Sequence, residues 1–306
     1  MNSSITAVSG IAVGHASSEP DGTGCTVLIG PFRAAVDVRG LATGTREIDA
    51  LDPTHLVPRI DALVLTGGSA PGLAAADGVM QWLRERGHGF DVGVTHIPIV
   101  PAAVIFDIRT ADQRSPDAAM GRAACDAANT EMVAEGRVGA GTGATVGKIR
   151  GVQHSSPGGL GSFATRHGEY TIGALAVVNA FGDVIDHTGN IVAGTRAEDG
   201  AFLNSMNALV STLPADAPIT NTTLCVIATD APLTRTGLQM LARMGSSGVV
   251  RRIAPANTVF DGDIVFALST SETSREFTPP ELLSFGVAAQ LVLEEAILRA
   301  VLTARP

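Results

Sequence analysis

The sequence predicts one α+β domain, on three grounds. Apolar runs rich in β-branched residues, such as 61–66 and 222–229, are typical of buried strands. Apolar residues at helical spacing over 281–302 follow the capping box that runs from Thr278 to Glu281, with proline at the first helical position. The 306 residues contain neither an internal repeat nor a low-complexity linker, so we expect a single folded unit with a substantial core.

The first part of the chain favours strands joined by turns. Apolar runs at 11–13, 26–29 and 34–38 each predict a short strand. Asp37 and Arg39 lie two residues apart, so in an extended chain their side chains share one face. We expect these two residues to form a structural ion pair.

A Gly-rich turn follows the predicted strand 61–66 and leads into a helix over 73–86. The glycine spacing at 67–72 lacks a nucleotide-binding pattern, so we interpret this segment as a tight turn that can line a pocket. Residues 96–107 contain two prolines and predict an edge strand or a pocket wall. The Ala-rich segment 116–135 predicts a helix.

The composition excludes several classes of function. A formal net charge of −9 disfavours binding to nucleic acids and anionic membranes, and a content of 4% aromatic residues disfavours base stacking. The N-terminus lacks a signal-peptide pattern and no apolar run reaches about 18 residues, so we expect a cytoplasmic protein. Cys25, Cys125 and Cys225 have no metal-ligand spacing and indicate reduced, buried thiols. We expect no metal and no cofactor.

A single lysine ends the Gly-rich segment 139–148. Of the 21 basic residues, 20 are arginine, and the exception is Lys148. A phosphate-binding loop would need glycine where Thr142 stands and serine or threonine where Ile149 stands. Lysine, unlike arginine, can lose its proton when it is buried. We therefore expect this segment to place Lys148 in a densely packed site, where it is a candidate catalytic residue.

Asn179 and two carboxylates are further candidates. The apolar run 171–186 predicts one strand interrupted by Asn179, whose amide must either bond to neighbouring backbone or donate to an oxyanion. Asp261 and Asp263 flank a glycine just before a buried strand, and in an extended chain they point to the same side. The structural alternative for this pair is an Asx turn.

The dipeptide Asn221-Thr222 stands where a loop over 213–220 meets the buried run 222–229. A threonine hydroxyl is a weak nucleophile, and one way to activate it is to make the threonine N-terminal, so that its own α-amine is the base. This requires the chain to be cut before Thr222. The alternative is a Thr-rich strand start in which asparagine supplies a turn.

Motifs along nearly the whole chain resemble those of the DmpA/β-aminopeptidase family, the L-aminopeptidase/D-esterases. In order, they are GIAVGH, TGCTV, VDVRG, LTGGSAPGLAAADGVMQWL, PIVPAAVIFD, GAGTGATVGK, LAVVNAFGDV, NTTLCVIATD and FDGDIVFALST. Within this family, the resemblance is strongest to the 6-aminohexanoate-oligomer (nylon-oligomer) hydrolases. That branch has Asn-Thr at the cut and Asp-Gly-Asp further on, whereas the peptidase members have Gly-Ser at the cut and serine in place of the first acid.

The resemblance implies a four-layer αββα sandwich and a self-cleaving N-terminal-nucleophile hydrolase. The precursor is expected to be cut between Asn221 and Thr222, which would give a larger chain, 1–221, and a smaller chain, 222–306. The family assembles as homo-oligomers, so we expect a dimer or tetramer.

The same resemblance assigns roles to five catalytic residues. Thr222 is the nucleophile, Asn179 donates to the oxyanion, and Lys148 offsets negative charge. Asp261 and Asp263 orient the amine and hydroxyl of the nucleophile.

Three residues are expected to contact substrate: Phe106, Gly141 and Thr142. Phe106 stands where the nylon-oligomer branch has tyrosine, so any contact through that hydroxyl is lost.

These assignments favour an autoprocessed amide hydrolase acting on short peptides, amino-acid amides or ω-amino-acid oligomers. No nucleic-acid or membrane partner is expected. Two alternatives stay open: an acyltransferase of the ornithine acetyltransferase type with a threonine nucleophile, and a non-catalytic ligand-binding protein.

Overall fold

The structure, a computed structural model, describes residues 2–211 and 221–304 of the chain. Its two main sheets share one long strand, β2 (Thr23–Val38). The start of β2 pairs with β4 (Ile60–Thr66), its end pairs with β16 (Ile264–Ser269), and a register shift inside β2 separates the two pairings. Such an irregularity bends a strand, so β2 passes from one sheet to the other.

The first sheet contains five strands, in the spatial order β1 (Ala12–Ser18), β2, β4, β7 (Ala102–Val104) and β3 (Thr45–Arg46). The second contains, in order, β10 (Gly159–His167), β11 (Tyr170–Asn179), β14 (Thr222–Thr229), β16 and the end of β2. Within this second sheet only β14 and β16 are parallel neighbours.

The remaining strands form small sheets: β5 (Phe90–Asp91) with β6 (His96–Ile97), β8 (Thr145–Val146) with β9 (Ser156–Pro157), and β13 (Ile191–Ala193), β12 (Asp183–Ile185) and β15 (Ile253–Ala254). The α-helices of the described residues are α1 (Ser69–Gly72), α2 (Ala75–Glu85), α3 (Ala118–Asp126), α4 (Ser205–Ser211), α5 (Arg235–Gly245), α6 (Ser247–Arg252) and α7 (Pro279–Leu302). Short 3-10 turns occur at Ile5–Ala7, Ile48–Leu51, Gly139–Gly141 and Val152–His154.

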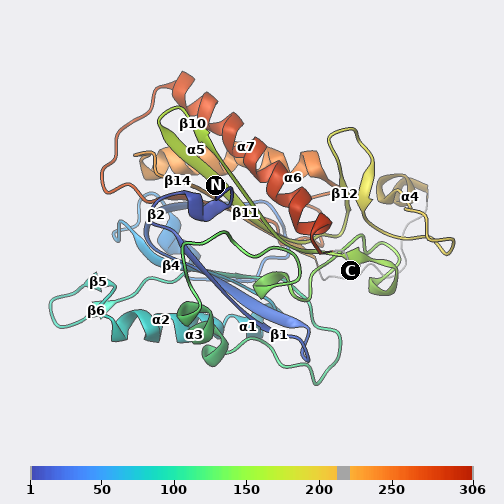
Figure 1. Cartoon of the computed structure of the whole chain (residues 1–306), viewed down its shortest axis with the longest axis horizontal. Helices are drawn as coiled ribbons and strands as arrows, with labels where there is room; N and C mark the ends of the chain where they lie inside the picture. Colours follow the sequence, from blue (N-terminus) through green and yellow to red (C-terminus); the bar gives the residue numbers. More distant parts are fainter. Residues whose placement is uncertain (1, 212–220, 305–306) are drawn as a thin grey trace.

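Three hydrophobic clusters fill the spaces between four layers. Along β14, Leu224 and Val226 belong to the cluster between the sheets, whereas Cys225 and Ile227 belong to the cluster beneath α5 and α7. A third cluster packs α2 and α3 against the first sheet. Neighbouring residues of a strand point to opposite faces, so each sheet buries both of its faces. Figure 1 shows the same order, with α5, α6 and α7 on one side, α2 and α3 on the other, and the strands between. The predicted α+β, αββα sandwich is confirmed.

Several predicted elements have different bounds. The strands expected at 26–29 and 34–38 are parts of the single strand β2. The strand expected over 171–186 was wrong as one element, because β11 ends at Asn179 and the later residues join β12 in another sheet.

The helix expected over 116–135 was also too long. Asp117 caps α3 by accepting a hydrogen bond from the Met120 N–H at 2.9 Å. The helix ends at Asp126, since Asn129 exchanges backbone hydrogen bonds with Val13 at the edge of β1. Tertiary pairing therefore overrides the helical preference of the Ala-rich run.

Other expectations are confirmed. Arg39 and Asp37 form an ion pair at 2.6 Å, and the capping box at Thr278 begins α7. The loop predicted at 213–220 lies outside the described residues. Within the part of the chain that is described, no helix is long and apolar enough to cross a membrane.

Candidate active site

Thr222 is the first residue of β14 and lines a pocket of about 300 Å³. It is 4% exposed, and its hydroxyl donates a hydrogen bond to the carbonyl oxygen of Asn221 at 2.5 Å. The rest of the lining comes from segments far apart in the sequence: residues 42–44, 69–70, Val104, Phe106 and Phe260. The predicted nucleophile and the bond that it is predicted to cut therefore lie in one concave site.

Gly262 brings a second donor to the same carbonyl. Its backbone N–H lies 2.9 Å from the carbonyl oxygen of Asn221. A β-carbon at Gly262 would lie 2.7 Å from the Thr222 hydroxyl oxygen and 2.8 Å from the carbonyl oxygen of Ala42, so only glycine leaves the hydroxyl its space. A backbone N–H that donates to this carbonyl oxygen can stabilise an oxyanion there. The sequence analysis missed Gly262, although its place between two aspartates was a signal.

Asp263 is buried beside the predicted nucleophile. One carboxylate oxygen accepts a hydrogen bond from the Thr223 N–H at 2.6 Å, and the other accepts one from the Asn257 N–H at 2.9 Å. Burial, together with the nearby charge of Asp261, raises the pKa of Asp263 to about 7. This carboxyl group can therefore gain or lose a proton near neutral pH.

Asp261 is held by a different set of donors. One of its oxygens accepts from the Thr258 hydroxyl at 2.6 Å and from the Thr258 N–H at 3.0 Å, and the other lies 3.4 Å from the Phe181 N–H. Burial raises the pKa of Asp261, while these hydrogen bonds and the charge of Lys148 act in the opposite direction. Thr258 is a second residue that the sequence analysis missed.

Lys148 and Asn179 meet at the end of β11. Asn179 lies directly opposite Thr222 in the pairing of β11 with β14. The ammonium group of Lys148, which is 1% exposed, donates to the side-chain oxygen of Asn179 at 2.8 Å and to its backbone oxygen at 3.0 Å. The Asn179 amide donates to the Phe106 carbonyl oxygen at 3.0 Å. In the uncut chain, the Gly262 N–H is a donor to the Asn221 carbonyl oxygen from outside the dipeptide.

The surroundings of Lys148 act on its pKa in opposing directions. Burial lowers its pKa well below the usual value, and the positive charge of Arg109 adds to this effect, whereas Asp261, Asp107 and Asp263 oppose it. Arg109 is fixed by hydrogen bonds to the Gly143 carbonyl oxygen at 2.9 Å and the Thr145 hydroxyl at 3.3 Å. The sequence analysis did not single out Arg109, because it lies in an exposed polar run that carries no motif.

The three residues that are predicted to contact substrate do not line the same pocket in the fold. Phe106 lines the pocket at Thr222. Gly141 is buried where a β-carbon would lie 2.5 Å from the Leu160 nitrogen. The Thr142 hydroxyl donates to the Gly139 carbonyl oxygen at 2.7 Å. Neither Gly141 nor Thr142 is among the residues that line this pocket, so a substrate contact for these two stays a prediction.

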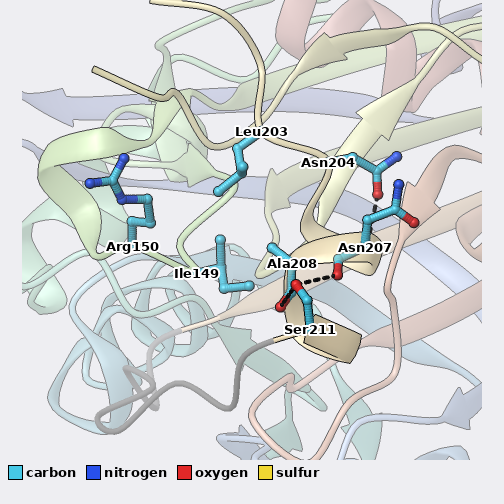
Figure 2. A pocket seen from close by; sticks show the side chains of 7 residues that line it. All are labelled: Ile149, Arg150, Leu203, Asn204, Asn207, Ala208 and Ser211. Atoms are coloured by element: carbon cyan, nitrogen blue, oxygen red, sulfur yellow. Dashed lines mark hydrogen bonds between the residues drawn. The ribbon is translucent and has the colours of Figure 1, made fainter. Parts of the chain in front are cut away.

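A larger pocket, of about 680 Å³, lies elsewhere. Figure 2 shows that it is formed between Ile149, Arg150 and Leu203 on one side and helix α4 on the other. None of the predicted catalytic side chains lines it. Among the described residues, no group of three or more histidine, cysteine, aspartate or glutamate side chains could hold a metal ion.

Solved structures define the class of the fold. A β-aminopeptidase from Burkholderia sp. has a TM-score of 0.74 and 22% identity, over 98% of this chain and 86% of that chain. The L-aminopeptidase D-Ala-esterase/amidase from Ochrobactrum anthropi has a TM-score of 0.74 and 22% identity, over 99% of this chain and 86% of that chain. The latter is described as a new variant among the Ntn hydrolase fold. The present chain has this fold.

The family follows from the sequence. Residues 3–306 match the peptidase family S58, and the chain belongs to it. An uncharacterized aminopeptidase of Mycobacterium tuberculosis is 41% identical over 338 residues, which cover 99% of this chain and 94% of the relative. A 6-aminohexanoate-oligomer endohydrolase of Kocuria sp. is 33% identical over 307 residues, which cover 95% of this chain and 84% of the relative. The predicted family membership is confirmed, and the chain is a hydrolase of amide or peptide bonds.

Proposed function

We propose that the chain is a precursor that cuts itself between Asn221 and Thr222. The products are residues 1–221 and 222–306, and the new N-terminal Thr222 is the nucleophile of the mature hydrolase. The hydrogen bond of 2.5 Å between the Thr222 hydroxyl and the Asn221 carbonyl oxygen carries this proposal, because it holds the nucleophile against the carbonyl group of the peptide bond that must break.

The first reaction is an acyl shift from nitrogen to oxygen. The Thr222 hydroxyl oxygen attacks the Asn221 carbonyl carbon, the peptide C–N bond breaks, and the nitrogen takes up a proton to become the α-amine. Water then hydrolyses the resulting ester, which frees the Thr222 hydroxyl and leaves a carboxylate on Asn221. The Gly262 N–H, 2.9 Å from the carbonyl oxygen, supports the oxyanion of the first step.

Substrate hydrolysis repeats this chemistry on an external amide. The α-amine of mature Thr222 acts as the base for its own hydroxyl. Asp263, which accepts from the Thr223 N–H at 2.6 Å, holds the start of β14 in position, and Asp261 holds Thr258, in the segment that leads to Gly262. Lys148 balances the two carboxylates and fixes Asn179, whose amide serves as an oxyanion donor in the mature enzyme.

The proposed substrates are short peptides, amino-acid amides and linear ω-amino-acid oligomers. Relatives named as aminopeptidases and as 6-aminohexanoate-oligomer endohydrolases support this range. The proposal includes a cytoplasmic location, which three free, buried cysteines suit.

A homo-oligomer, either dimer or tetramer, is also part of the proposal. Leu283, Val287 and Leu291 follow one another at intervals of four on α7 and are 60%, 48% and 55% exposed. Residues four apart lie on one helix face, so they form an apolar stripe that a second copy can cover. Light scattering after size-exclusion chromatography gives the oligomeric state.

Mass spectrometry of purified protein tests self-cleavage. The wild-type chain is expected to appear as two fragments, and Thr222→Ala as one intact chain without amidase activity. Thr229→Val is the matched control, since it removes a buried hydroxyl at the other end of the same strand, β14. Two fragments from Thr222→Ala, or a fully active wild-type chain that is never cut, would overturn the proposal.

A further inference from the structure

A serine with a strained backbone lines the pocket at Thr222. Ser69 has a φ of +53°, in the left-handed region, and it is one of the residues that form this pocket. For a residue with a β-carbon this conformation is unfavourable, because the β-carbon approaches the following carbonyl oxygen. Glycine, asparagine and aspartate adopt it more readily than serine does. Strained residues cluster at functional sites, so the Ser69 side chain is a candidate for a role in this pocket.

The two residues before Ser69 are glycines for steric reasons. A β-carbon at Gly67 would lie 2.2 Å from the Asp107 Oδ2 atom and 2.2 Å from the Thr23 hydroxyl oxygen. Gly68 has a φ of +74°, which glycine adopts without strain, and a β-carbon there would also collide with its neighbours. Ser69 has the same sign of φ but carries a side chain. Glycine would relieve the strain at this position too, so serine is present here in spite of the backbone.

Hydrogen bonds on both sides hold this turn in its strained form. The Gly68 N–H donates to the Asp107 Oδ1 atom at 2.6 Å, and the Ser69 N–H donates to the Ile105 carbonyl oxygen at 3.0 Å. The Ser115 hydroxyl donates to the Gly68 carbonyl oxygen at 3.2 Å. A strained conformation persists where surrounding contacts over-determine it. The backbone of the turn therefore fixes the position of the Ser69 β-carbon at the pocket.

Ser69 differs from the other non-glycine residues with positive φ. Among the described residues these are Glu47, Ser69 and Asn257. The Glu47 side chain accepts a hydrogen bond from the Val100 N–H at 2.8 Å, and asparagine adopts this conformation readily. Ser69 is partly exposed, and its hydroxyl makes no hydrogen bond to the part of the chain that is described. Its hydroxyl can therefore bind a molecule that enters the pocket.

We propose, on the basis of the function proposed above, that Ser69 is a substrate-binding residue whose hydroxyl forms a hydrogen bond with an amide group of the substrate. A hydroxyl both donates and accepts, so it matches either the carbonyl oxygen or the N–H of an amide. Self-cleavage does not need this bond, because the Asn221 carbonyl oxygen already accepts from the Gly262 N–H at 2.9 Å. Loss of the Ser69 hydroxyl therefore weakens the binding of substrate and leaves self-cleavage intact.

Two variants separate the hydroxyl from the backbone strain. Ser69→Ala removes the hydroxyl and keeps the β-carbon, whereas Ser69→Gly removes both. We expect both variants to cut themselves at the wild-type rate and to raise KM by about 3- to 10-fold with kcat unchanged, the effect of one lost hydrogen bond between uncharged groups. We expect the Tm of Ser69→Gly to equal or exceed that of the wild type, because glycine relieves the strain at a φ of +53°. The glycine variant is thus the poorer enzyme without being the less stable protein.

The probe is the compound that self-cleaved wild-type protein hydrolyses fastest in a panel of amino-acid and dipeptide p-nitroanilides. Ser211→Ala is the control, because it removes a serine hydroxyl from the larger pocket at α4, and we expect it to keep the wild-type KM.

A wild-type KM in Ser69→Ala would overturn the inference and leave the proposed function standing. Slower self-cleavage of Ser69→Ala together with a lower Tm would show a structural role and overturn it as well. Self-cleaved wild-type protein that hydrolyses no compound of the panel would overturn the inference but not the self-cleavage. Uncut, inactive wild-type protein would overturn the proposed function and the inference together.

Discussion

Replacing Gly262 by alanine changes the space around the Thr222 hydroxyl, the proposed nucleophile, and little else. The added β-carbon would lie 2.7 Å from the Thr222 hydroxyl oxygen and 2.8 Å from the Ala42 carbonyl oxygen. A carbon–oxygen contact of this length cannot persist, so the hydroxyl or the turn at Gly262 must move. The backbone of Gly262 is not in the left-handed region, so alanine adds crowding without backbone strain.

The expected effect is large on cleavage and moderate on stability. A shift of about 1 Å between reacting groups costs about 100-fold in rate, and the loss of one oxyanion donor costs about 100- to 1,000-fold. We expect Gly262→Ala to cut itself at least about 100-fold more slowly than the wild type. Overpacking of a buried site typically costs about 1–3 kcal/mol, which leaves the chain folded.

The assay follows intact and cut chains by mass spectrometry over time after expression, with thermal unfolding measured on the same samples. Gly237→Ala, on α5, is the matched control, because its β-carbon would meet the end of the Leu233 side chain at 3.2 Å, a tight contact that a small shift of this side chain relieves, and Gly237 does not line the pocket. We expect this control to cut normally. If Gly262→Ala cuts at the wild-type rate with unchanged Tm, Gly262 does not position the reacting groups and the reasoning is refuted.

Two further predictions concern buried charge. Lys148→Met removes one partner from a buried charge cluster, a change that typically costs about 3–5 kcal/mol, so Tm should fall. Turnover of the folded protein should drop about 100-fold or more, and wild-type turnover would contradict a role for the ammonium group. The pKa of Asp263 is raised to about 7 in the folded chain, against about 3.9 in an unfolded chain. Between these two pH values, the folded chain therefore binds a proton that the unfolded chain has lost. Its contribution to stability is therefore complete below about pH 4 and is lost as pH rises to about 7, by up to about 4 kcal/mol. Urea unfolding of uncut Thr222→Ala at pH 5 and pH 8, with and without Asp263→Asn, measures this loss, and an identical pH dependence in both proteins would contradict it.

Local sequence patterns determined the elements that carry the chemistry. The buried β-branched run starting at Thr222 predicted β14, and the capping box at Thr278 predicted the start of α7. The isolated Lys148 among arginines identified a residue that the structure buries completely against Asn179. The sequence predicts these features because strand alternation, helix capping and residue choice depend on neighbours along the chain.

Only the tertiary structure decided how these residues meet. The pairing of β11 with β14 sets Asn179 opposite Thr222, and the turn before β16 brings the Gly262 N–H to the Asn221 carbonyl. Such contacts join segments tens of residues apart, and they follow from sheet register and the passage of β2 between the sheets. The pocket lining around Phe106 also comes from separate segments. The sequence by itself therefore identified the family and named candidates for its reacting groups, whereas the packed sheets decided how these residues are arranged.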